Sequence, residues 1–276
     1  MKRACVIGWP VAHSRSPLIH GYWLQKYGIE GSYTKEAVAP ENVAQFLAAL
    51  GQRGFVGCNV TVPHKEQAFA VAAERDASAV VVGAANTVWL ENGKLHAANT
   101  DTYGYMTNLG LQAPGWKQRD APVCVLGAGG AARAIVHGFL QAGVTQVRVF
   151  NRSRERADAL VRDLGPRVRV CDWDERSVLS REAAVLVNTT SLGLKGSGET
   201  GIDFTGFHPA TVVCDIVYVP LETAFLRVAR RHGLATVDGL GMLLHQAVPG
   251  FAQWFKVIPS VTDDLTALIA ADIGRV

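Results

Sequence analysis

The chain has 276 residues, of which 49% are hydrophobic and 18% are charged, and its formal net charge at pH 7 is +3. A chain of this length and apolar content can bury one or two cores and is not expected to be disordered or heavily solvated. Its arginines alternate with acidic residues instead of forming a basic stripe, so we expect no nucleic-acid partner and favour a small anionic ligand.

The cysteines lie in or beside apolar runs, and none is paired in a C-x-x-C spacing; they are Cys5, Cys58, Cys124, Cys171 and Cys214. This pattern predicts small buried hydrophobic residues and fits a reducing compartment. No stretch approaches about 18 uninterrupted apolar residues, and the N-terminal apolar run is too short for a signal peptide, so we expect no membrane span and a cytoplasmic protein. No set of His, Cys, Asp and Glu has metal spacing, so no metal is expected.

The first third of the chain alternates β-rich runs with helical runs. Strands are predicted over 4–8, 31–39 and 55–62, and helices over 16–28, 41–54 and 65–74. Ser16 is the expected N-cap of the first helix because Pro17 follows it at the first helical position. The alternation is typical of βαβ units and predicts an α/β fold with a mainly parallel sheet.

The stretch 86–100 interrupts this alternation. Its two β-rich pieces flank Asn92-Gly93, the strongest short signal for a hairpin. A helix is predicted over 102–109 and a loop over 113–122. We therefore place a domain boundary between 101 and 122.

A second α/β series follows this boundary. Strands are predicted over 123–127, 146–150, 168–173, 184–190, 211–218 and 235–238, and helices over 130–142, 154–164, 221–233 and 240–255. The last helix is apolar, and we expect it to return to the first domain, which otherwise lacks helices for both faces of its sheet. The loop over 191–209 is long, Gly-rich and polar, as functional or mobile loops often are.

The segment VCVLGAGGAARA predicts a strand, a glycine turn and the start of a helix. Its spacing, Gly127-x-Gly129-x-x-Ala132, has the G-x-G-x-x-A form of a dinucleotide-binding turn. Gly127 permits the tight turn, Gly129 lets the backbone approach a pyrophosphate, and the helix start supplies N–H groups. The alternative is a glycine-rich turn without a ligand.

The end of the next strand indicates which dinucleotide is bound. Asn151 stands where NAD-binding proteins usually have an acidic residue, and Arg152, Ser153, Arg154 and Arg156 follow. An acid would repel a 2′-phosphate, whereas arginines and a hydroxyl would hold it, so the sequence favours NADP, with Arg152 on the adenosine phosphate. The alternative is an exposed basic helix start, which the helix dipole disfavours.

Polar residues gather where strands of the first domain end, at Ser14, Ser16, Asn59, Thr61, Lys65, Asn86 and Asp101. Ligands of α/β proteins bind at this edge of the sheet. Hydride transfer from an alcohol needs a group that takes the alcohol proton, and a lysine held by an aspartate can do so, which makes Lys65 and Asp101 the candidate catalytic pair. Singly, Ser16 and Asp101 could equally be helix caps.

At these residues the sequence resembles the shikimate dehydrogenase family along the whole chain. The matching segments are GWPVAHSRSPLIH (8–20), GCNVTVPHKE (57–66), GAANT (83–87), NTD (99–101), VLGAGGAARA (125–134), NRS (151–153), DIVYVPLET (215–223) and DGLGMLLHQA (238–247). The resemblance implies a reversible NADP-dependent oxidation of shikimate to 3-dehydroshikimate, a step of aromatic amino-acid biosynthesis. It also implies a substrate-binding domain (1–101), a Rossmann-like NADP-binding domain (102–238) and a C-terminal helical segment (239–276) that packs on the first domain.

The resemblance assigns roles residue by residue. Lys65 and Asp101 match the catalytic pair. Ser14 and Ser16, with Tyr218 nearby, match contacts to the substrate carboxylate, and Asn59, Thr61, Asn86 and Gln246 match contacts to the ring hydroxyls. The implied cofactor-binding residues are Gly127, Ala128, Gly129, Gly130, Ala131, Asn151, Arg152, Ser153, Arg156, Thr190, Gly239 and Met242. The expected partner is the small-molecule substrate, with a homodimer as a candidate assembly.

One residue departs from the family pattern beside the catalytic pair. Thr102 stands where the family commonly has glycine, and we expect it to change the rate or the substrate range but not the type of reaction.

Three other functions remain as alternatives. A quinate/shikimate dehydrogenase that uses NAD is disfavoured by the pair Ser14 and Ser16 and by the Asn-Arg-Ser run. A catalytically silent NADP-binding regulatory relative is disfavoured because both Lys65 and Asp101 are present. A folate-type dehydrogenase has a similar two-domain layout, but the HSRSP and DGLGMLLHQ segments do not suit it.

Overall fold

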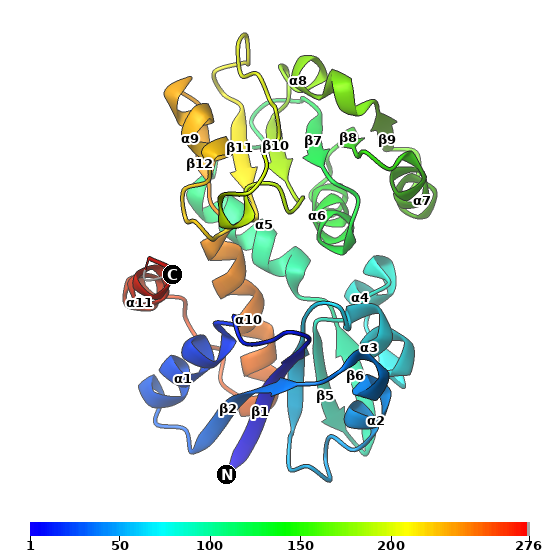
Figure 1. Ribbon diagram of the computed structural model, residues 1–276, viewed down its shortest axis with the longest axis vertical. Coiled ribbons are helices and arrows are strands. Elements are labelled where there is room, and N and C mark those ends of the chain that lie inside the picture. Colours follow the sequence, from blue (N-terminus) through cyan, green and yellow to red (C-terminus); the bar gives the residue numbers. More distant parts are fainter. Residues whose placement is uncertain (275–276) are drawn as a thin grey trace. The chain divides into compact units, whose positions relative to one another are not determined.

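The structure, a computed structural model, describes residues 1–274 and divides into two compact units (Figure 1). Unit 1 consists of Met1–Asp101 and Leu244–Ile269, and unit 2 of Thr102–Leu243 with the described residues from Ala270 onward. Within residues 1–274, no helix is long and apolar enough to cross a membrane. The same part of the chain contains only free cysteines, four of which are buried.

Unit 1 is built on a six-stranded sheet in the order β2-β1-β3-β5-β6-β4. Its strands are β1 (Lys2–Gly8), β2 (Gly31–Ala37), β3 (Gly57–Val60), β4 (Glu74–Arg75), β5 (Thr87–Glu91) and β6 (Lys94–Ala98). β1 pairs in parallel with β2 and β3, and β4 in parallel with β6, whereas β5 is antiparallel to both of its neighbours. The predicted hairpin is confirmed, because Asn92 and Gly93 join β5 to β6 with φ of 52° and 75°, as a type I′ turn requires.

The helices of unit 1 are α1 (Ser16–Lys26), η1 (Pro40–Asn42), α2 (Val43–Ala48), α3 (Lys65–Val71) and α4 (Ala77–Val82). The unit also contains most of α10 (Leu240–Phe255) and the first part of α11 (Asp263–Ile273). The prediction that Ser16 caps α1 is wrong: Arg15 is the N-cap and Ser16 is the first helical residue. The Ser14 hydroxyl accepts the Ser16 N–H at 3.3 Å instead, so the residue two positions earlier serves the helix start.

Two layers of helices cover the sheet of unit 1 (Figure 1). On one face, β1 and β3 pack with α2 and α3 through Ile7, Val60, Phe46 and Ala68. On the other face α10 returns to the sheet, as predicted, and the Trp254 indole donates a hydrogen bond to the Val88 carbonyl at 3.0 Å. The ring centroids of Trp23 in α1 and Phe251 in α10 lie 5.3 Å apart, so these two helices cover this face together.

Unit 2 has a fully parallel six-stranded sheet in the order β12-β11-β10-β7-β8-β9. Its strands are β7 (Val123–Leu126), β8 (Val147–Phe150), β9 (Val168–Cys171), β10 (Val185–Asn188), β11 (Val212–Asp215) and β12 (Ala235–Val237). Its helices are α5 (Asp101–Gln112, from Thr102), α6 (Gly130–Gln141), α7 (Arg154–Leu164), η2 (Trp173–Glu175), α8 (Arg176–Leu179), η3 (Leu194–Gly196) and α9 (Ala224–Arg231). This is the doubly wound order of dinucleotide-binding domains, and its topological switch point lies between β7 and β10.

The apolar run of β7 explains why this sheet is covered on both faces. Val123 and Val125 point into the core shared with α5 and α6, whereas Cys124 and Leu126 point into the core shared with α9. All four are 0% exposed. A strand buried on both faces needs a continuous apolar sequence, which is why VCVL shows no alternation.

Some predicted elements are shorter than expected, and several short ones were not predicted. The helix expected over 41–54 is η1 followed by α2, and the strand expected over 55–62 is β3 at Gly57–Val60. β4 and α4 were missed because two and six residues are too few for a clear periodicity.

Candidate functional site

Lys65 and Asp101 form an ion pair at the edge of the sheet of unit 1. Lys65 is the first residue of α3, just beyond the turn that follows β3, and Asp101 follows β6. The Lys65 Nζ lies 2.6 Å from the Asp101 Oδ2, and the two side chains are 29% and 9% exposed. A cation in the first turn of a helix opposes the helix dipole, and the carboxylate compensates for it. The ammonium remains partly accessible to a ligand.

The carboxylate of Asp101 is held on its other side as well. Asn86 Nδ2 donates to the Asp101 Oδ1 at 2.8 Å, and the Asp101 backbone N–H donates to the Asn99 Oδ1 at 3.0 Å. Both asparagines are 3% exposed. Each carboxylate oxygen therefore has its own donor, which orients the group that receives Lys65.

The carboxamide of Asn86 is engaged at both ends. Its Oδ1 accepts from the Thr100 N–H at 2.9 Å and from the Thr87 hydroxyl at 3.1 Å. Its Nδ2 donates to the Thr100 hydroxyl at 3.0 Å as well as to Asp101. The Thr100 hydroxyl in turn donates to the Gln246 carbonyl at 2.7 Å, which links α10 to this cluster. A ligand hydroxyl that contacts Asn86 has to share or replace one of these bonds.

Asn59 lies deeper in the same network. Its Oδ1 accepts from the Tyr33 hydroxyl at 2.6 Å, and its Nδ2 donates to the Asn86 carbonyl and the Thr87 hydroxyl, both at 3.2 Å. Asn59 is 5% exposed. The structure therefore brings Asn59, Asn86 and Asp101 into one hydrogen-bonded cluster.

Ser14, Ser16 and Thr61 lie near the carboxyl ends of the adjacent parallel strands β1 and β3. The Ser14 hydroxyl donates to the Ser16 hydroxyl at 3.2 Å. The Thr61 N–H donates to the Ile7 carbonyl at 2.9 Å, which fixes Thr61 beside the end of β1. Burial raises the pKa of Tyr33 well above its ordinary value, and a hydrogen bond with Ser16 opposes this shift. Tyr33 therefore lies beside Ser16 as well as Asn59.

The network contains residues that sequence analysis did not single out. These are Tyr33, Thr87, Asn99 and Thr100. Thr87, Asn99 and Thr100 lie inside the GAANT and NTD segments, so the segments that carry the family resemblance already contained them. Tyr33 has no such signal, because it is one aromatic residue in an ordinary strand.

The glycine turn of unit 2 follows β7 at the switch point. Gly127 has a φ of 108°, and a Cβ there would lie 2.6 Å from the Thr189 hydroxyl. Both the positive φ and the lack of space for a Cβ therefore require glycine at this position. Gly129 is the N-cap of α6, and a Cβ on Gly129 or Gly130 would meet nothing within 4 Å. Open backbone N–H groups at a helix N-terminus fit a pyrophosphate.

The basic run after β8 begins α7. The Asn151 side chain donates to the Ser153 carbonyl at 2.7 Å and so shapes the turn into the helix. Arg152 and Arg156 are exposed. The Arg152 guanidinium lies 5.9 Å from the ring centroid of Trp173, which follows the neighbouring strand β9. Exposed guanidinium groups beside a helix N-terminus suit a phosphate group.

Thr190 follows β10, on the other side of the switch point. Its hydroxyl donates to the Asn188 Oδ1 at 2.7 Å, and the Asn188 Nδ2 donates to the Asp215 Oδ1 at 3.0 Å. Burial raises the pKa of Asp215 to about 6, opposed by hydrogen bonds from the Val217 N–H, Thr223 and Asn188. A buried carboxylate therefore supports the loop on which Thr190 lies.

Gly239 and Met242 have clear packing roles in unit 2. A Cβ on Gly239 would overlap the carbonyl of Ile216, so the close approach of these segments requires glycine. Met242 is 9% exposed and packs in the core of the unit. Tyr218 is half-buried and lies three residues beyond β11. Tyr218, Gly239 and Met242 belong to unit 2, whereas Ser14 and Ser16 belong to unit 1.

Thr102 connects α5 to α6 within unit 2. Its hydroxyl donates to the Ala134 carbonyl at 2.8 Å. A Cβ added to Gly138 would lie 3.1 Å from the Thr102 methyl group, so the two helices are close at this point. The residue that departs from the family pattern thus contributes to helix packing.

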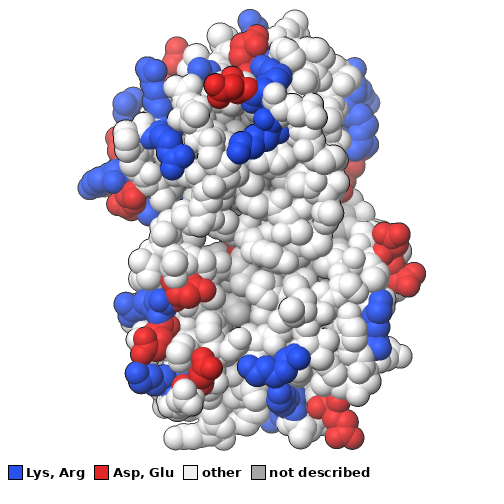
Figure 2. All heavy atoms as spheres, turned by 180° about the vertical axis from the view of Figure 1, so that it is seen from behind, with Lys and Arg blue, Asp and Glu red and all other residues white. Residues whose placement is uncertain are grey.

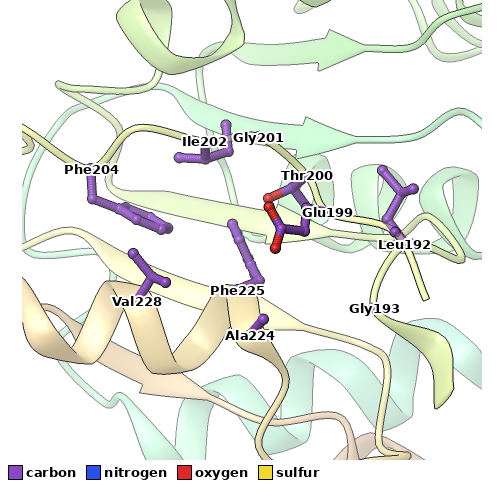
Figure 3. Close-up of a pocket in the computed structure, with 11 residues that line it drawn as sticks. Leu192, Gly193, Glu199, Thr200, Gly201, Ile202, Phe204, Ala224, Phe225 and Val228 are labelled. Carbon is purple, nitrogen blue, oxygen red and sulfur yellow. The ribbon is translucent and has the colours of Figure 1, made fainter. Parts of the chain in front are cut away.

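Two further surface features lie outside this site. A cavity of about 90 Å³ lies between the Gly-rich loop and α9 in unit 2, and none of the predicted site residues lines it (Figure 3). Phe204 and Val228 lie toward one end of it and Leu192 toward the other, with Phe225, Glu199 and Thr200 between them (Figure 3). On the face drawn in Figure 2, Lys and Arg side chains lie among Asp and Glu side chains. Among the described residues, no group of three or more His, Cys, Asp or Glu could hold a metal.

Family models match both units of the chain. The model described as the shikimate dehydrogenase substrate binding domain matches residues 6–88. The model described as shikimate / quinate 5-dehydrogenase matches residues 111–194.

Individual proteins match along nearly the whole chain. The shikimate dehydrogenase (NADP(+)) of Azorhizobium caulinodans is 52% identical over 99% of this chain and 98% of its own length. The crystal structure of shikimate 5-dehydrogenase from Thermus thermophilus in complex with NADP(H) and shikimate has 36% identity and a TM-score of 0.87, with 99% of this chain and 100% of that chain covered. The quinate dehydrogenase from Corynebacterium glutamicum in complex with NAD has 26% identity and a TM-score of 0.89, with coverage of 98% and 99%.

Proposed function

This chain belongs to the shikimate dehydrogenase family, and on that premise we propose that it catalyses the reversible NADP-dependent oxidation of shikimate to 3-dehydroshikimate. In the biosynthetic direction it reduces 3-dehydroshikimate, as a step of aromatic amino-acid biosynthesis. The observation that carries the proposal is the ion pair of Lys65 and Asp101 beside the buried Asn86. A lysine held by a carboxylate at the end of a parallel strand is suited to moving the proton of an alcohol.

The roles of the catalytic pair follow from the chemistry of alcohol oxidation, which releases a hydride and a proton. NADP, when bound, accepts or returns the hydride at its nicotinamide ring. The Lys65 Nζ takes the proton from the substrate oxygen or returns it, and Asp101 orients the ammonium group and balances its charge. The Lys65 Nζ and the Asp101 Oδ2 are 2.6 Å apart, so the carboxylate is placed to hold the ammonium group that proton transfer to Lys65 produces.

Substrate binding is assigned to unit 1. Ser14 and Ser16 supply hydroxyl donors for the carboxylate, with Tyr218 as a further contact. Thr61, Asn59, Asn86 and Gln246 supply contacts to the ring hydroxyls. This assignment is supported by the position of these residues, apart from Tyr218, near the ends of β1 and β3, just before the start of β5 and on α10.

Cofactor binding is assigned to unit 2, with NADP preferred over NAD. The backbone from Gly127 to Ala131 would hold the pyrophosphate. Asn151, Arg152, Ser153 and Arg156 would hold the adenosine phosphate, and Thr190, Gly239 and Met242 would lie on the nicotinamide side. The preference is supported by the absence of an acidic residue at the end of β8 and by the exposed guanidinium groups that follow it. The relative from Corynebacterium glutamicum, in complex with NAD, defines the alternative.

We also propose that the protein acts in the cytoplasm, which is consistent with its free thiols. A homodimer remains a candidate assembly, and light scattering on purified protein decides between monomer and dimer.

The decisive test is the absorbance at 340 nm of purified protein with shikimate or quinate, each combined with NADP⁺ or NAD⁺. Rapid reduction of the cofactor only with shikimate and NADP⁺ is the expected result. Comparable rates with quinate and NAD⁺ would assign the chain to the quinate-oxidising branch. Folded protein that binds NADP but reduces it with neither substrate would contradict the proposal.

A further inference from the structure

A continuous chain of hydrogen bonds runs through unit 1 from Tyr33 to the proposed catalytic pair. It passes from the Tyr33 hydroxyl to Asn59 at 2.6 Å, from Asn59 to the Thr87 hydroxyl at 3.2 Å, and from Thr87 to Asn86 at 3.1 Å. Asn86 then donates to Asp101 at 2.8 Å. Asp101 receives the Lys65 ammonium on its other oxygen.

Every donor in this series of hydrogen bonds points toward Asp101. Tyr33 donates to the oxygen of Asn59, so the amide nitrogen of Asn59 faces Thr87. Because the Thr87 hydroxyl accepts that bond, its own proton is directed to the oxygen of Asn86, and the amide nitrogen of Asn86 faces the carboxylate. The reversed amide would place a carbonyl oxygen against a carboxylate oxygen, which is repulsive.

The Thr87 hydroxyl bridges the side chains of Asn59 and Asn86. Burial keeps water from taking the place of this hydroxyl. Thr87 is 2% exposed, and Asn59 and Asn86 are 5% and 3% exposed. Thr87 also pairs with Asn59 across β3 and β5, so the strand ladder keeps its backbone in place whatever the side chain does. Removal of the Thr87 hydroxyl should therefore leave the pairing of β3 with β5 intact.

We propose that Thr87 is a positioning residue for the reaction. Its hydroxyl orients the carboxamide of Asn86, which fixes the Asp101 carboxylate and through it the direction in which Lys65 presents its amine. The inference rests on the proposed function, because it assigns Thr87 a role only if Lys65 and Asp101 transfer the proton. The Thr100 N–H also holds the Asn86 oxygen at 2.9 Å, so loss of Thr87 loosens the arrangement without abolishing it.

The test compares Thr87→Val, which keeps the shape and removes the hydroxyl, with Thr87→Ser, which restores it. Thr211→Val is the matched control, because Thr211 is 0% exposed and its hydroxyl donates at 2.7 Å to the Ala183 carbonyl in the core of unit 2. We expect Thr87→Val to lower kcat about tenfold, less than the roughly hundredfold loss that a misplacement of about 1 Å can cause, because the Thr100 N–H still holds the Asn86 oxygen. The KM for NADP should stay unchanged, and Thr87→Ser should recover most of the rate. Thr211→Val should lower the Tm and leave kcat unchanged.

A double-mutant cycle separates positioning from general destabilisation. If Thr87 acts through Asp101, Thr87→Val should change kcat by less than about twofold in an Asp101→Asn background, because coupled residues are not additive. Equal effects in both backgrounds, or a Thr87→Val variant with the wild-type kcat, would overturn the inference while leaving the proposed function intact. Failure of the proposed function itself is distinct, because the wild-type protein would then not oxidise shikimate.

If Thr87→Val does not fold, Tyr33→Phe tests the inference instead, because Tyr33 is the first donor in the series of hydrogen bonds. It removes the donor that orients Asn59, and we expect a several-fold lower kcat with an unchanged KM for NADP. An unchanged kcat in Tyr33→Phe would then overturn the inference.

Discussion

The ammonium group of Lys65 lies 2.6 Å from a carboxylate oxygen of Asp101, although the two residues are 36 positions apart in the sequence. The pair combines a 29% exposed lysine with a 9% exposed aspartate. The aspartate is fixed by buried neighbours, whereas the lysine can still reach a ligand.

Removal of the amine should abolish most of the turnover. We expect Lys65→Ala to lower kcat by a factor on the order of 10² to 10⁴, the range typical of acid–base groups, with a nearly normal NADP affinity. Lys94→Ala is the matched control, because Lys94 forms an exposed ion pair with Glu74 at 2.8 Å, and its kcat should equal that of the wild type. Steady-state kinetics and NADP titration measure both quantities, and an unchanged kcat in Lys65→Ala would remove Lys65 from the mechanism.

Arg152 should determine the preference for the phosphorylated cofactor. A charge-assisted hydrogen bond to a phosphate contributes about 2 kcal/mol, so Arg152→Gln should raise the KM for NADP tenfold or more and leave the KM for NAD unchanged. Arg227→Gln is the control in the same unit, since Arg227 pairs with Glu222 at 3.2 Å on the surface. An equal loss for both cofactors in Arg152→Gln would show that Arg152 does not read the 2′-phosphate.

Asp215 should make the free energy of unfolding fall as the pH rises, which is the opposite of the usual effect of an aspartate. Burial raises its pKa from 3.8 to about 6, so the folded state binds this proton more tightly than the unfolded state does. The contribution of Asp215 to stability is therefore present below pH 4 and is lost as the pH rises toward 6. This difference in pKa between the unfolded and the folded state corresponds to about 3 kcal/mol at most.

The variant Asp215→Asn isolates this effect. The free energy of unfolding of the variant minus that of the wild type should increase between pH 4 and pH 6 and then level off. The difference between the two proteins is used because His20 also makes stability depend on pH. Burial lowers the pKa of His20 to about 3, so its contribution to the free energy of unfolding rises with pH in both proteins and cancels in the difference. In Asp203→Asn the difference should fall with rising pH only below about pH 4 and stay constant between pH 4 and pH 6, since backbone hydrogen bonding to Thr205 lowers the pKa of the exposed Asp203 from 3.8. Urea unfolding at several pH values measures each difference, and a constant difference for Asp215→Asn would contradict the prediction.

Gly57 should be irreplaceable for packing. A Cβ at this position would overlap the Trp254 indole and the Val88 carbonyl, which the indole hydrogen-bonds. We expect Gly57→Ala to destabilise the fold by about 1–3 kcal/mol, as overpacking of a core usually does. Gly21→Ala is the control, because a Cβ at Gly21 in α1 meets nothing within 4 Å. Thermal unfolding should show a lower Tm for the first variant and an equal or higher Tm for the second.

Local patterns predicted much of the fold. The bounds of α7 and α10 agree with the predicted ranges, and the hairpin at Asn92-Gly93 and the turn at Gly127 are confirmed. These features depend on periodicity and on backbone conformations that particular residues favour. The capping role of Ser16 was wrong, because Ser14, two residues earlier, receives its N–H. A single sequence cannot distinguish such neighbouring polar groups.

The sequence by itself determined the alternation of strands and helices, the glycine turn and the types of polar residue that follow the strands. Only the tertiary structure decided which of these polar groups share hydrogen bonds. The reason is that strands far apart in the chain pair side by side, so that Tyr33, Asn59 and Thr87, from β2, β3 and β5, come within hydrogen-bonding distance. Burial then fixes the direction of each bond, because an unpaired donor or acceptor in the core is costly. That requirement, and not a local pattern, brings an ordinary strand residue such as Thr87 into the hydrogen-bond network that reaches Asp101.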